Sequence, residues 1–314
     1  MQARMRPVLS ADRVVTIAEA ALHLEIASAQ HLPHEWGNEN WLLSAASGHQ
    51  FLLKIGPAES APKWSATRVA YQRAEDLGIP APRLLHFDAA CADAGGRVVR
   101  LLTWIDGSTP SSVIEAGAAR DRFFADLGAT LRRLHDGALP AFSSRLDGSA
   151  PSFRRWEDYV AHRFPQIADR ARATSAFTEA ELSSFEGEVT GLASEVAAFV
   201  RPALCHRDLH LHNLLAHEDG SLAGVLDFDC AEAWDPAVDL VKLRWQVFGS
   251  YDGASAAFEG AYFTDGACPE RWQRRLRLVD LLELINAVTN ARMAPDHGYE
   301  QAARSRLTDV LASI

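Results

Sequence analysis

Hydrophobic and polar residues alternate along the segment WGNENWLLSAASGHQFLLKI. Near its end, Phe51, Leu53 and Ile55 alternate with Leu52 and Lys54, which is the two-residue period of a strand. The letters SAASGH before them are rich in turn-forming residues, so the segment predicts two strands joined by a turn. Lys54 would then lie on the face opposite Phe51, among apolar neighbours.

A helix and two further strands follow in the same part of the chain. The segment SATRVAYQRAEDLG has helical spacing, with Ser65 at the predicted N-cap and Gly78 just beyond the end. The segments IPAPRLLHFDAA and GRVVRLLTWIDG have the composition of strands. We therefore predict a small, sheet-rich N-terminal lobe over residues 1–103, which ends near Thr103.

Helical patterns dominate after the turn-rich connector DGSTPSS. The segment RDRFFADLGATLRRLHDG places Phe124, Leu127, Leu131 and Leu134 on one stripe, and ERWQRRLRLVDLLELINAVTNARM is a second long helical segment. Between them, NLLAHEDGSLAGVLDFD predicts two short strands around an Asp-Gly turn. The pattern thus predicts an α+β fold with a larger, mainly helical lobe over residues 104–314, and sites tend to form at such junctions.

Composition excludes several classes of protein. The 314 residues are 48% hydrophobic and 23% charged, as in ordinary globular proteins. No apolar run approaches the roughly 18 residues of a membrane span, and Asp12 and Glu19 interrupt the place of a signal peptide, so we expect a cytoplasmic protein without a membrane partner. A net charge of −10 argues against nucleic acid as a partner.

The segment CHRDLHLHNLL concentrates histidine, aspartate and asparagine. On a strand, His206, Asp208, His210 and His212 would share one side and could ligate zinc, as in a zinc-dependent hydrolase. On a loop, Asp208 would instead be a base beside an attacking hydroxyl, and Asn213 a magnesium ligand.

Two residues elsewhere favour the second interpretation. Asp227 ends the apolar segment GVLD, nineteen residues after Asp208, where a second magnesium ligand is needed. Phosphoryl transfer also needs a lysine on a strand of the first lobe, and Lys54 lies on such a predicted strand. Phosphoryl transfer requires all of these groups together.

In this order the motifs resemble the aminoglycoside phosphotransferase and choline kinase-like branch of the protein-kinase-like fold. The resemblance covers most of the chain and rests on the segments FLLKI, IPAPRLL, LGATLRRLH, HRDLHLHN, VLDFD and WDPAVDL. It implies a bilobal enzyme that uses ATP or GTP as phosphate donor and Mg²⁺ as cofactor. Asn213 and Asp227 would hold the metal, and Asp208 would orient and deprotonate the acceptor hydroxyl.

The resemblance also implies roles for residues around these motifs. Lys54 would contact the α- and β-phosphates, and backbone groups near Thr103 and Ile105 would hydrogen-bond the purine. His206 and Asp239 would brace the catalytic loop. For His210, support of the loop and contact with the acceptor are both open.

Two positions depart from the family pattern. Arg68 stands where the family has a glutamate that pairs with the strand lysine, and Glu59 and Glu75 are candidates for a substitute. The segment WGNENW has a single glycine, Gly37, where a protein kinase has a glycine-rich phosphate loop. Only a dozen residues separate Asp227 from Asp239, which is too short for an activation loop that binds peptides.

These observations predict an O-phosphotransferase that acts on a hydroxyl of a small antibiotic or metabolite. Besides the zinc hydrolase, a catalytically silent nucleotide-binding module is an alternative, because the glutamate is missing. The charge distribution further predicts a cationic, aminoglycoside-like acceptor, since residues 104–314 contain 31 acidic and 21 basic residues. The candidate acceptor-binding acids are Asp229, Glu232, Glu157 and Asp158, the last two beside Trp156 and Tyr159, which could stack on a ring.

Overall fold

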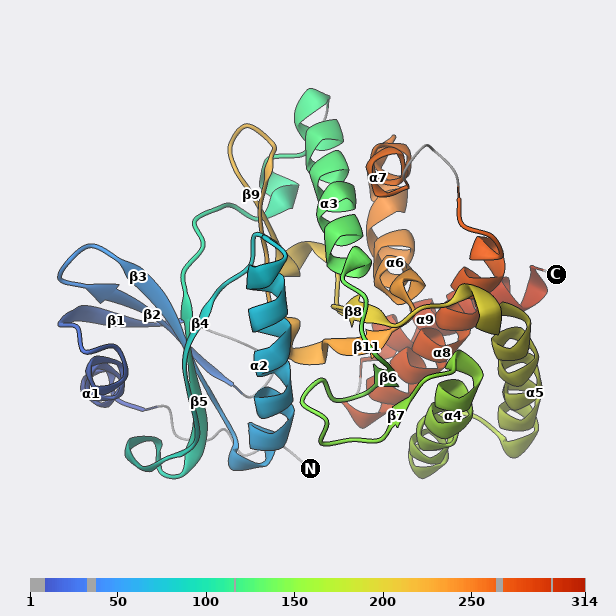
Figure 1. Ribbon diagram of the computed structural model, residues 1–314, viewed down its shortest axis with the longest axis horizontal. Helices are drawn as coiled ribbons and strands as arrows, with labels where there is room; N and C mark the ends of the chain where they lie inside the picture. Colours follow the sequence, from blue (N-terminus) through green and yellow to red (C-terminus); the bar gives the residue numbers. More distant parts are fainter. Residues whose placement is uncertain (1–8, 33–37, 116, 264–267, 295, 314) are drawn as a thin grey trace.

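A five-stranded antiparallel sheet forms the N-terminal part of the computed structural model, which describes residues 9–32, 38–115, 117–263, 268–294 and 296–313. Its strands lie in the order β1 (Ile26–Leu32), β2 (Glu39–Ala45), β3 (Gln50–Gly56), β5 (Arg97–Thr103) and β4 (Leu84–Cys91). The helix α1 (Ala11–Leu22) covers one face, and α2 (Ala61–Asp76) lies between the sheet and the rest of the molecule (Figure 1).

The two faces of β3 have different surroundings. Phe51, Leu53 and Ile55 pack with Val14 and Ile17 of α1 in a core of their own. The side chain of Lys54 points to the opposite face, as the alternation predicts, and there it contacts the C-terminal lobe. Strand register pairs Lys54 directly with Arg100 of β5, so two cations lie side by side.

Helices build the C-terminal lobe, which shares one large apolar core. Two helix pairs pack closely, α3 (Ala118–Asp136) with α7 (Ala254–Tyr262) and α8 (Trp272–Met293) with α9 (His297–Ala312). A Cβ atom on Gly128 would come within 2.3 Å of the backbone oxygen of Phe258, so glycine is required where α3 meets α7. The helices α4 (Trp156–Ala173) and α5 (Glu179–Val196) complete the lobe.

Short strands in this lobe carry the loops that the motifs predict. A four-stranded sheet has the order β7 (Ser152–Phe153), β6 (Phe142–Ser143), β11 (Glu232–Trp234), β8 (Ala203–Cys205). Beside it, β9 (Leu214–Ala216) and β10 (Leu222–Val225) form the predicted hairpin. The segment with the histidines lies between β8 and β9 and is a loop, not a strand.

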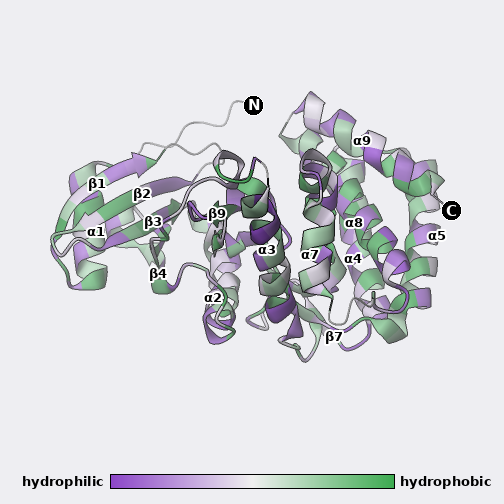
Figure 2. Cartoon of the chain, turned by 90° about the horizontal axis from the view of Figure 1, so that it is seen from above, coloured by the Kyte–Doolittle hydropathy of each residue, from purple (hydrophilic) through white to green (hydrophobic). Residues whose placement is uncertain are grey.

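The predicted α+β class is confirmed, with a sheet first and helices afterwards (Figure 1). The predicted start of the second helix is wrong: α2 begins at Ala61, with Pro62 in its first turn, where proline is tolerated. Hydrophilic and hydrophobic residues mix along the helices (Figure 2), and none of the described helices is long and apolar enough to cross a membrane.

Candidate active site

The loop after β8 is held by one buried carboxylate. Asp239 accepts hydrogen bonds from the backbone N–H groups of His206 (2.8 Å) and Arg207 (2.5 Å) and from Nε2 of His135 (2.9 Å). Burial opposes ionisation, but these donors and the charge of His135 hold the pKa of Asp239 below its ordinary value. Arg207 has a positive φ of 65°, a costly conformation that this bracing stabilises.

The ring of His206 connects this loop to the hairpin that follows it. Its Nδ1 accepts the backbone N–H of Asp208 (3.2 Å), and its Nε2 lies 2.7 Å from the carbonyl oxygen of Leu226. These two contacts assign the proton to Nε2. Since Leu226 directly precedes Asp227, one imidazole fixes Asp208 and Asp227 relative to each other.

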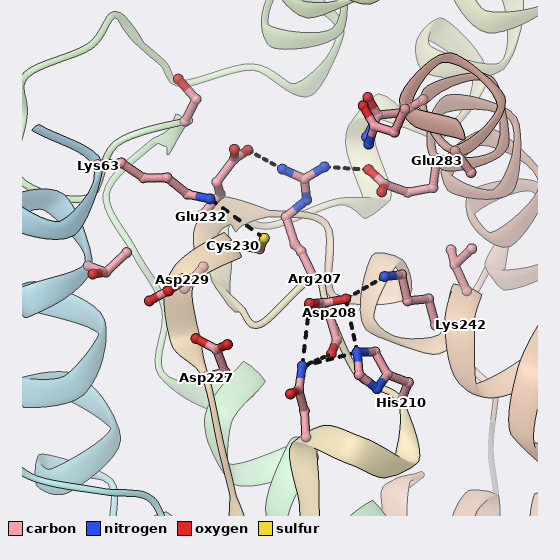
Figure 3. Close-up of a pocket in the computed structure, with 18 of the residues that line it drawn as sticks. Lys63, Arg207, Asp208, His210, Asp227, Asp229, Cys230, Glu232, Lys242 and Glu283 are labelled. Atoms are coloured by element: carbon pink, nitrogen blue, oxygen red, sulfur yellow. Dashed lines mark hydrogen bonds and ion pairs between the residues drawn. The ribbon is translucent and has the colours of Figure 1, made fainter. Parts of the chain in front are cut away.

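Asp208 lies between groups that favour its charged form. Lys242, at the end of the short helix α6 (Leu240–Lys242), forms an ion pair with Oδ1, and Nε2 of His210 lies 3.6 Å from the same oxygen (Figure 3). Burial raises the pKa of Asp208, but His210 and Lys242 outweigh it and hold the pKa well below its ordinary value. The amide nitrogen of Asn213 donates to the backbone oxygen of Asp208 (2.9 Å).

Two carboxylates after β10 compensate the two cations of the sheet. Lys54 lies 3.1 Å from Asp227 and 3.4 Å from Asp229, and Arg100 forms an ion pair with Asp229. Arg100 is 1% exposed and stacks over the ring of Trp64 at 4.1 Å. We call Lys54, Arg100, Asp227 and Asp229 the ion-pair cluster.

Lys54 thus has different partners from those that the sequence predicts. Glu75 pairs instead with Arg83 (3.7 Å), and Arg68 lies over the ring of Phe87 (5.2 Å). The carboxylates that Lys54 contacts come from the C-terminal lobe, so a sequence search along α2 could not find them. The other departure, Gly37, lies outside the described residues.

The connection between the lobes follows β5. The backbone N–H of Thr103 donates to the carbonyl of Arg83 (3.0 Å), and that of Trp104 donates to Gln50 (3.3 Å). Ile105 lies two residues after Thr103, and its side chain packs against Gly224 on β10. A Cβ atom on Gly224 would lie 3.0 Å from Cδ1 of Ile105. Thr103 and Ile105 are therefore placed at the lobe junction, and the N–H of Thr103 is already used.

A cleft of about 1240 Å³ opens between the lobes. Its lining includes Asp208, Asn213 and Asp227, together with residues of α4, α8 and α9. The volume exceeds the range of roughly 300–1,000 Å³ for a single small-ligand pocket, so two substrates have room to bind side by side.

The predicted acceptor-binding acids divide into two groups. Asp229 and Glu232 line the cleft, and so does His210, whose buried Nδ1 has no partner among the described residues. Glu157 pairs with Arg155 at the start of α4, Asp158 is exposed, and neither lines the cleft. The suggested ring stacking is wrong, because the lobe's core contains both rings, Trp156 and Tyr159, each 1% exposed.

Beyond Asp208, the cleft has a wall rich in arginine. Arg145 comes from the β6–β7 connection, Arg163 and Arg170 from α4, and Arg207 from the catalytic loop. Figure 3 shows Arg207 between two glutamates, Glu232 of β11 and Glu283 of α8. We call this set the arginine wall: Arg145, Arg163, Arg170, Arg207, Glu232 and Glu283.

The acid excess of the second lobe does not extend into the cleft. Among the described residues, the lining has six Lys or Arg side chains and five Asp or Glu side chains. The electrostatic premise for a cationic acceptor is therefore wrong. Sequence reasoning also missed Lys242 and the arginines of α4, which no local motif marks.

A zinc site in the histidine segment finds no support. In the part of the chain that the structure describes, the three side chains whose ligand atoms converge within 4.8 Å are His135, Cys205 and Asp239. They are buried, and His135 already hydrogen-bonds Asp239. His210 and His212 line the cleft, with ring centroids 5.7 Å apart.

Comparisons with solved structures identify similar folds. Aminoglycoside phosphotransferase APH(4)-Ia with ADP and hygromycin B is 13% identical, with a TM-score of 0.70 and coverage of 95% of this chain and 97% of that chain. APH(2")-IIa with streptomycin and ATP is 14% identical, with a TM-score of 0.66 and coverage of 97% of both chains. A putative fructosamine-3-kinase from Thermobifida fusca is 18% identical, with a TM-score of 0.69 and coverage of 95% and 100%.

At these identities the similarity shows the protein-kinase-like fold alone. No curated protein matches the sequence. The model of the phosphotransferase enzyme family, by contrast, matches residues 28–302, which is most of the chain and includes every residue of the catalytic loop and of the ion-pair cluster described above. The chain therefore belongs to the phosphotransferase enzyme family.

Proposed function

We propose that the enzyme transfers the γ-phosphate of ATP or GTP to a hydroxyl group of a small molecule. The observation that carries this proposal is the placement of Asp208, Asn213 and Asp227 in one cleft, with Asp208 and Asp227 fixed through His206. The short connection from Asp227 to Asp239 leaves no peptide platform, which favours a small acceptor.

Asp208 is proposed as the catalytic residue that positions the acceptor. The hydroxyl oxygen bonds to the γ-phosphorus while the bond to the β–γ bridging oxygen breaks, and that electron pair leaves with the nucleoside diphosphate. Asp208 accepts the hydroxyl proton. Its depressed pKa makes it a weak base, so orientation is its larger contribution, which suits a loose transition state with little bonding to the nucleophile.

Asp227 and Asn213 fit the requirements of Mg²⁺. The amide nitrogen of Asn213 donates to Asp208, which leaves its amide oxygen for a cation, and the carboxylate of Asp227 is 30% exposed. Magnesium prefers such oxygen ligands. When bound, it supplies neutralisation of charge on the phosphates.

Other residues complete the nucleotide site in this proposal. Lys54 releases Asp227 and contacts the α- and β-phosphates, while Asp229 keeps its ammonium group in place. At the lobe junction, backbone groups near Thr103 and Ile105 bind the purine. The N–H of Ile105 is the better donor, because the N–H of Thr103 bonds Arg83.

Asp227→Ala tests the metal assignment. The variant should need on the order of 100-fold more Mg²⁺ for half-maximal activity, the upper range for disturbing a metal site. Asp219→Ala is the control, since Asp219 is 59% exposed on the β9–β10 turn and pairs with Arg122. An unchanged magnesium titration for Asp227→Ala would remove its assigned role.

The acceptor is proposed to be a hydroxylated antibiotic or metabolite. The structural neighbours named with hygromycin B and streptomycin support including aminoglycosides among the candidates. A panel of aminoglycosides, macrolides, nucleoside and peptide antibiotics, choline, homoserine, sugars and hydroxy acids should be assayed with ATP and GTP in parallel, with and without Mg²⁺.

Asp208→Asn enzyme serves as the blank for this panel. Phosphate transfer that requires both Mg²⁺ and Asp208 supports the proposal. Nucleotide binding without any transfer or magnesium-dependent hydrolysis would instead identify a catalytically silent module, and stoichiometric zinc on the purified protein would contradict the phosphotransferase chemistry.

A further inference from the structure

The helix α4 presents two arginines to the cleft. Arg163 and Arg170 are seven residues apart, close to two helical turns, so they lie on the same face. Both line the cleft beside Arg207 and Arg145. Four guanidinium groups from three separate segments therefore converge on one side of the proposed acceptor space.

Arg207 uses both glutamates of the arginine wall. Its guanidinium lies 2.6 Å from Glu232, pairs with Glu283 as well, and stacks over Trp234 at 4.2 Å. Its side chain is only 8% exposed. Burial alone would lower the pKa of Arg207, but the two carboxylates raise it well above its ordinary value. Arg207 is therefore a fixed, compensated part of the wall.

The other arginines are compensated less completely. Arg163 reaches Glu232 only at 3.5 Å and donates to the neutral Gln166 (3.1 Å), and its buried Nε has no partner among the described residues. Arg170 donates to the neutral amide oxygen of Asn286 (2.5 Å), and within the described residues it has no carboxylate in ion-pair range. Partial burial and the repulsion from Arg163 lower the pKa of Arg170, while Glu283 and Glu232, beyond ion-pair range, act against this.

The side chain of Arg145 likewise has no ion pair with any residue that the structure describes. The wall thus holds four arginines against two glutamates. Assembling uncompensated cations at a cleft costs free energy, which a bound anion would recover.

We propose that Arg163 and Arg170, assisted by Arg145, bind an oxyanion group of the acceptor, either a carboxylate or a phosphate. This inference rests on the proposed phosphotransferase function and names its substrate class as an acidic polyhydroxylated molecule. Guanidinium groups match carboxylate and phosphate oxygens in bidentate geometry, which makes them specific for such groups. Asn286 and Asn290, on the facing side of α8, add neutral polar groups to the same region.

The arrangement assigns opposite ends of the acceptor to opposite charges. The anionic group binds at α4, and a hydroxyl group reaches Asp208, which lies next to Arg207 in the chain. In the transfer step this hydroxyl oxygen gains the bond to the γ-phosphorus and loses its proton to Asp208. An amine-bearing acceptor would instead bring a further cation to the uncompensated arginines.

A binding experiment tests the anion site without any transfer reaction. The enzyme is saturated with Mg²⁺ and a non-hydrolysable ATP analogue, so that the phosphate site is occupied, and is titrated calorimetrically with malonate and with sulfate at constant ionic strength. Arg170→Gln should weaken both about tenfold, a loss of about 1.4 kcal/mol. The ratio of malonate to sulfate affinity then distinguishes a carboxylate from a phosphate ligand.

Arg172→Gln is the matched control. Arg172 lies on the same helix but points to the surface acids Asp169 and Glu179, so its loss should leave anion affinity unchanged. Thermal melting of both variants shows that they fold. Absence of saturable anion binding, or equal losses in Arg170→Gln and Arg172→Gln, would overturn the proposal.

A second arm tests acceptor preference on one carbon skeleton. Glucuronate and glucose 6-phosphate should bind at least tenfold more tightly than glucose, and glucosamine no more tightly than glucose, an order that Arg170→Glu should abolish. Preference for glucosamine over the acids contradicts the inference. Mg²⁺-dependent nucleotide hydrolysis, measured on the same samples, reports on the phosphotransferase proposal separately, so the two can fail independently.

Discussion

The ion-pair cluster, whose Asp227 and Asp229 line the cleft, and the arginine wall balance charge differently. In the ion-pair cluster, Lys54 and Arg100 face Asp227 and Asp229, so two cations meet two carboxylates. In the arginine wall, four arginines share two glutamates. The first set is neutral as it stands, whereas the second still lacks counter-charge.

This difference separates structural from ligand-binding charge. Like charges directly opposite on neighbouring strands destabilise a sheet, and the two carboxylates offset this repulsion between Lys54 and Arg100. The arginines of α4 are balanced less completely, since Arg163 shares Glu232 with Arg207 and Arg170 has no carboxylate in ion-pair range among the described residues, so their charge remains available for a ligand. The net charge of −10 gives the wrong sign for this region, because the surplus acids lie elsewhere on the second lobe.

The largest effect is expected at Asp208, which lines the same cleft. Asp208→Asn should lower turnover by about two to four orders of magnitude, the range for lost base catalysis and positioning, with little change in nucleotide affinity. Steady-state turnover and calorimetric nucleotide binding check the two parts. Near-normal turnover with the true acceptor would show that another group positions the hydroxyl.

The charge balance of the ion-pair cluster can be broken at Arg100. Arg100→Met leaves Asp229, which is 14% exposed, with Lys54 as its remaining cation, so stability should fall by about 3 kcal/mol, the lower range for breaking a buried ion pair. Denaturant unfolding measures this loss. The exposed pair Arg122–Asp219 supplies the control, since Arg122→Met should cost at most about 1 kcal/mol.

The difference in stability between wild type and Arg100→Met should depend on pH in a definite direction. Burial raises the pKa of Asp229, but Arg100 and Lys54 outweigh it and hold the pKa below its ordinary value. Stabilisation of this kind is complete above the unfolded-state pKa of about 4 and is lost as the pH falls below it. Wild type and Arg100→Met should therefore differ fully at neutral pH and converge in acid. A constant difference would show that packing alone matters.

Local patterns predict single members of the ion-pair cluster and of the catalytic loop, but not which of them pair. Alternation predicts β3 and the direction of Lys54, and the spacing of Asp208, Asn213 and Asp227 predicts a phosphotransferase loop, because these residues lie within one short segment. Helix α4 escaped prediction partly because it contains Pro165, which normally interrupts a helix.

The arginine wall could not be predicted from the sequence. Its members extend from Arg145 to Glu283, on a loop, two helices, a strand and the catalytic loop, so only tertiary packing brings them together. The partners of Lys54 have the same explanation, since Asp227 and Asp229 belong to the other lobe. Neither convergence has a local periodicity or spacing that a sequence could reveal.

A smaller effect is expected at Lys242, which we assign as a positioning residue for Asp208. Burial raises the pKa of Asp208 and Lys242 helps to lower it, so Lys242→Met should raise it. Since ionised Asp208 is the active form, the acid limb of the kcat/KM profile should move to higher pH. Lys63→Met is the control, because Lys63 lines the cleft but contacts Cys230 at 3.9 Å instead of Asp208. An unmoved acid limb would make Lys242 merely structural.

The smallest effect is expected where the sequence placed acceptor-binding acids. Glu157 pairs with Arg155 outside the cleft, and Asp158 is exposed, so Glu157→Gln and Asp158→Asn should change the acceptor KM less than about twofold, as for other surface charges. The salt dependence of the acceptor KM does not distinguish a cationic acceptor bound by acids from an anionic acceptor bound by arginines, because screening weakens attraction of either sign. The direction of the change decides instead: a cationic acceptor would make both substitutions raise KM and Arg170→Gln lower it, whereas an anionic acceptor makes Arg170→Gln raise KM and leaves the other two without effect.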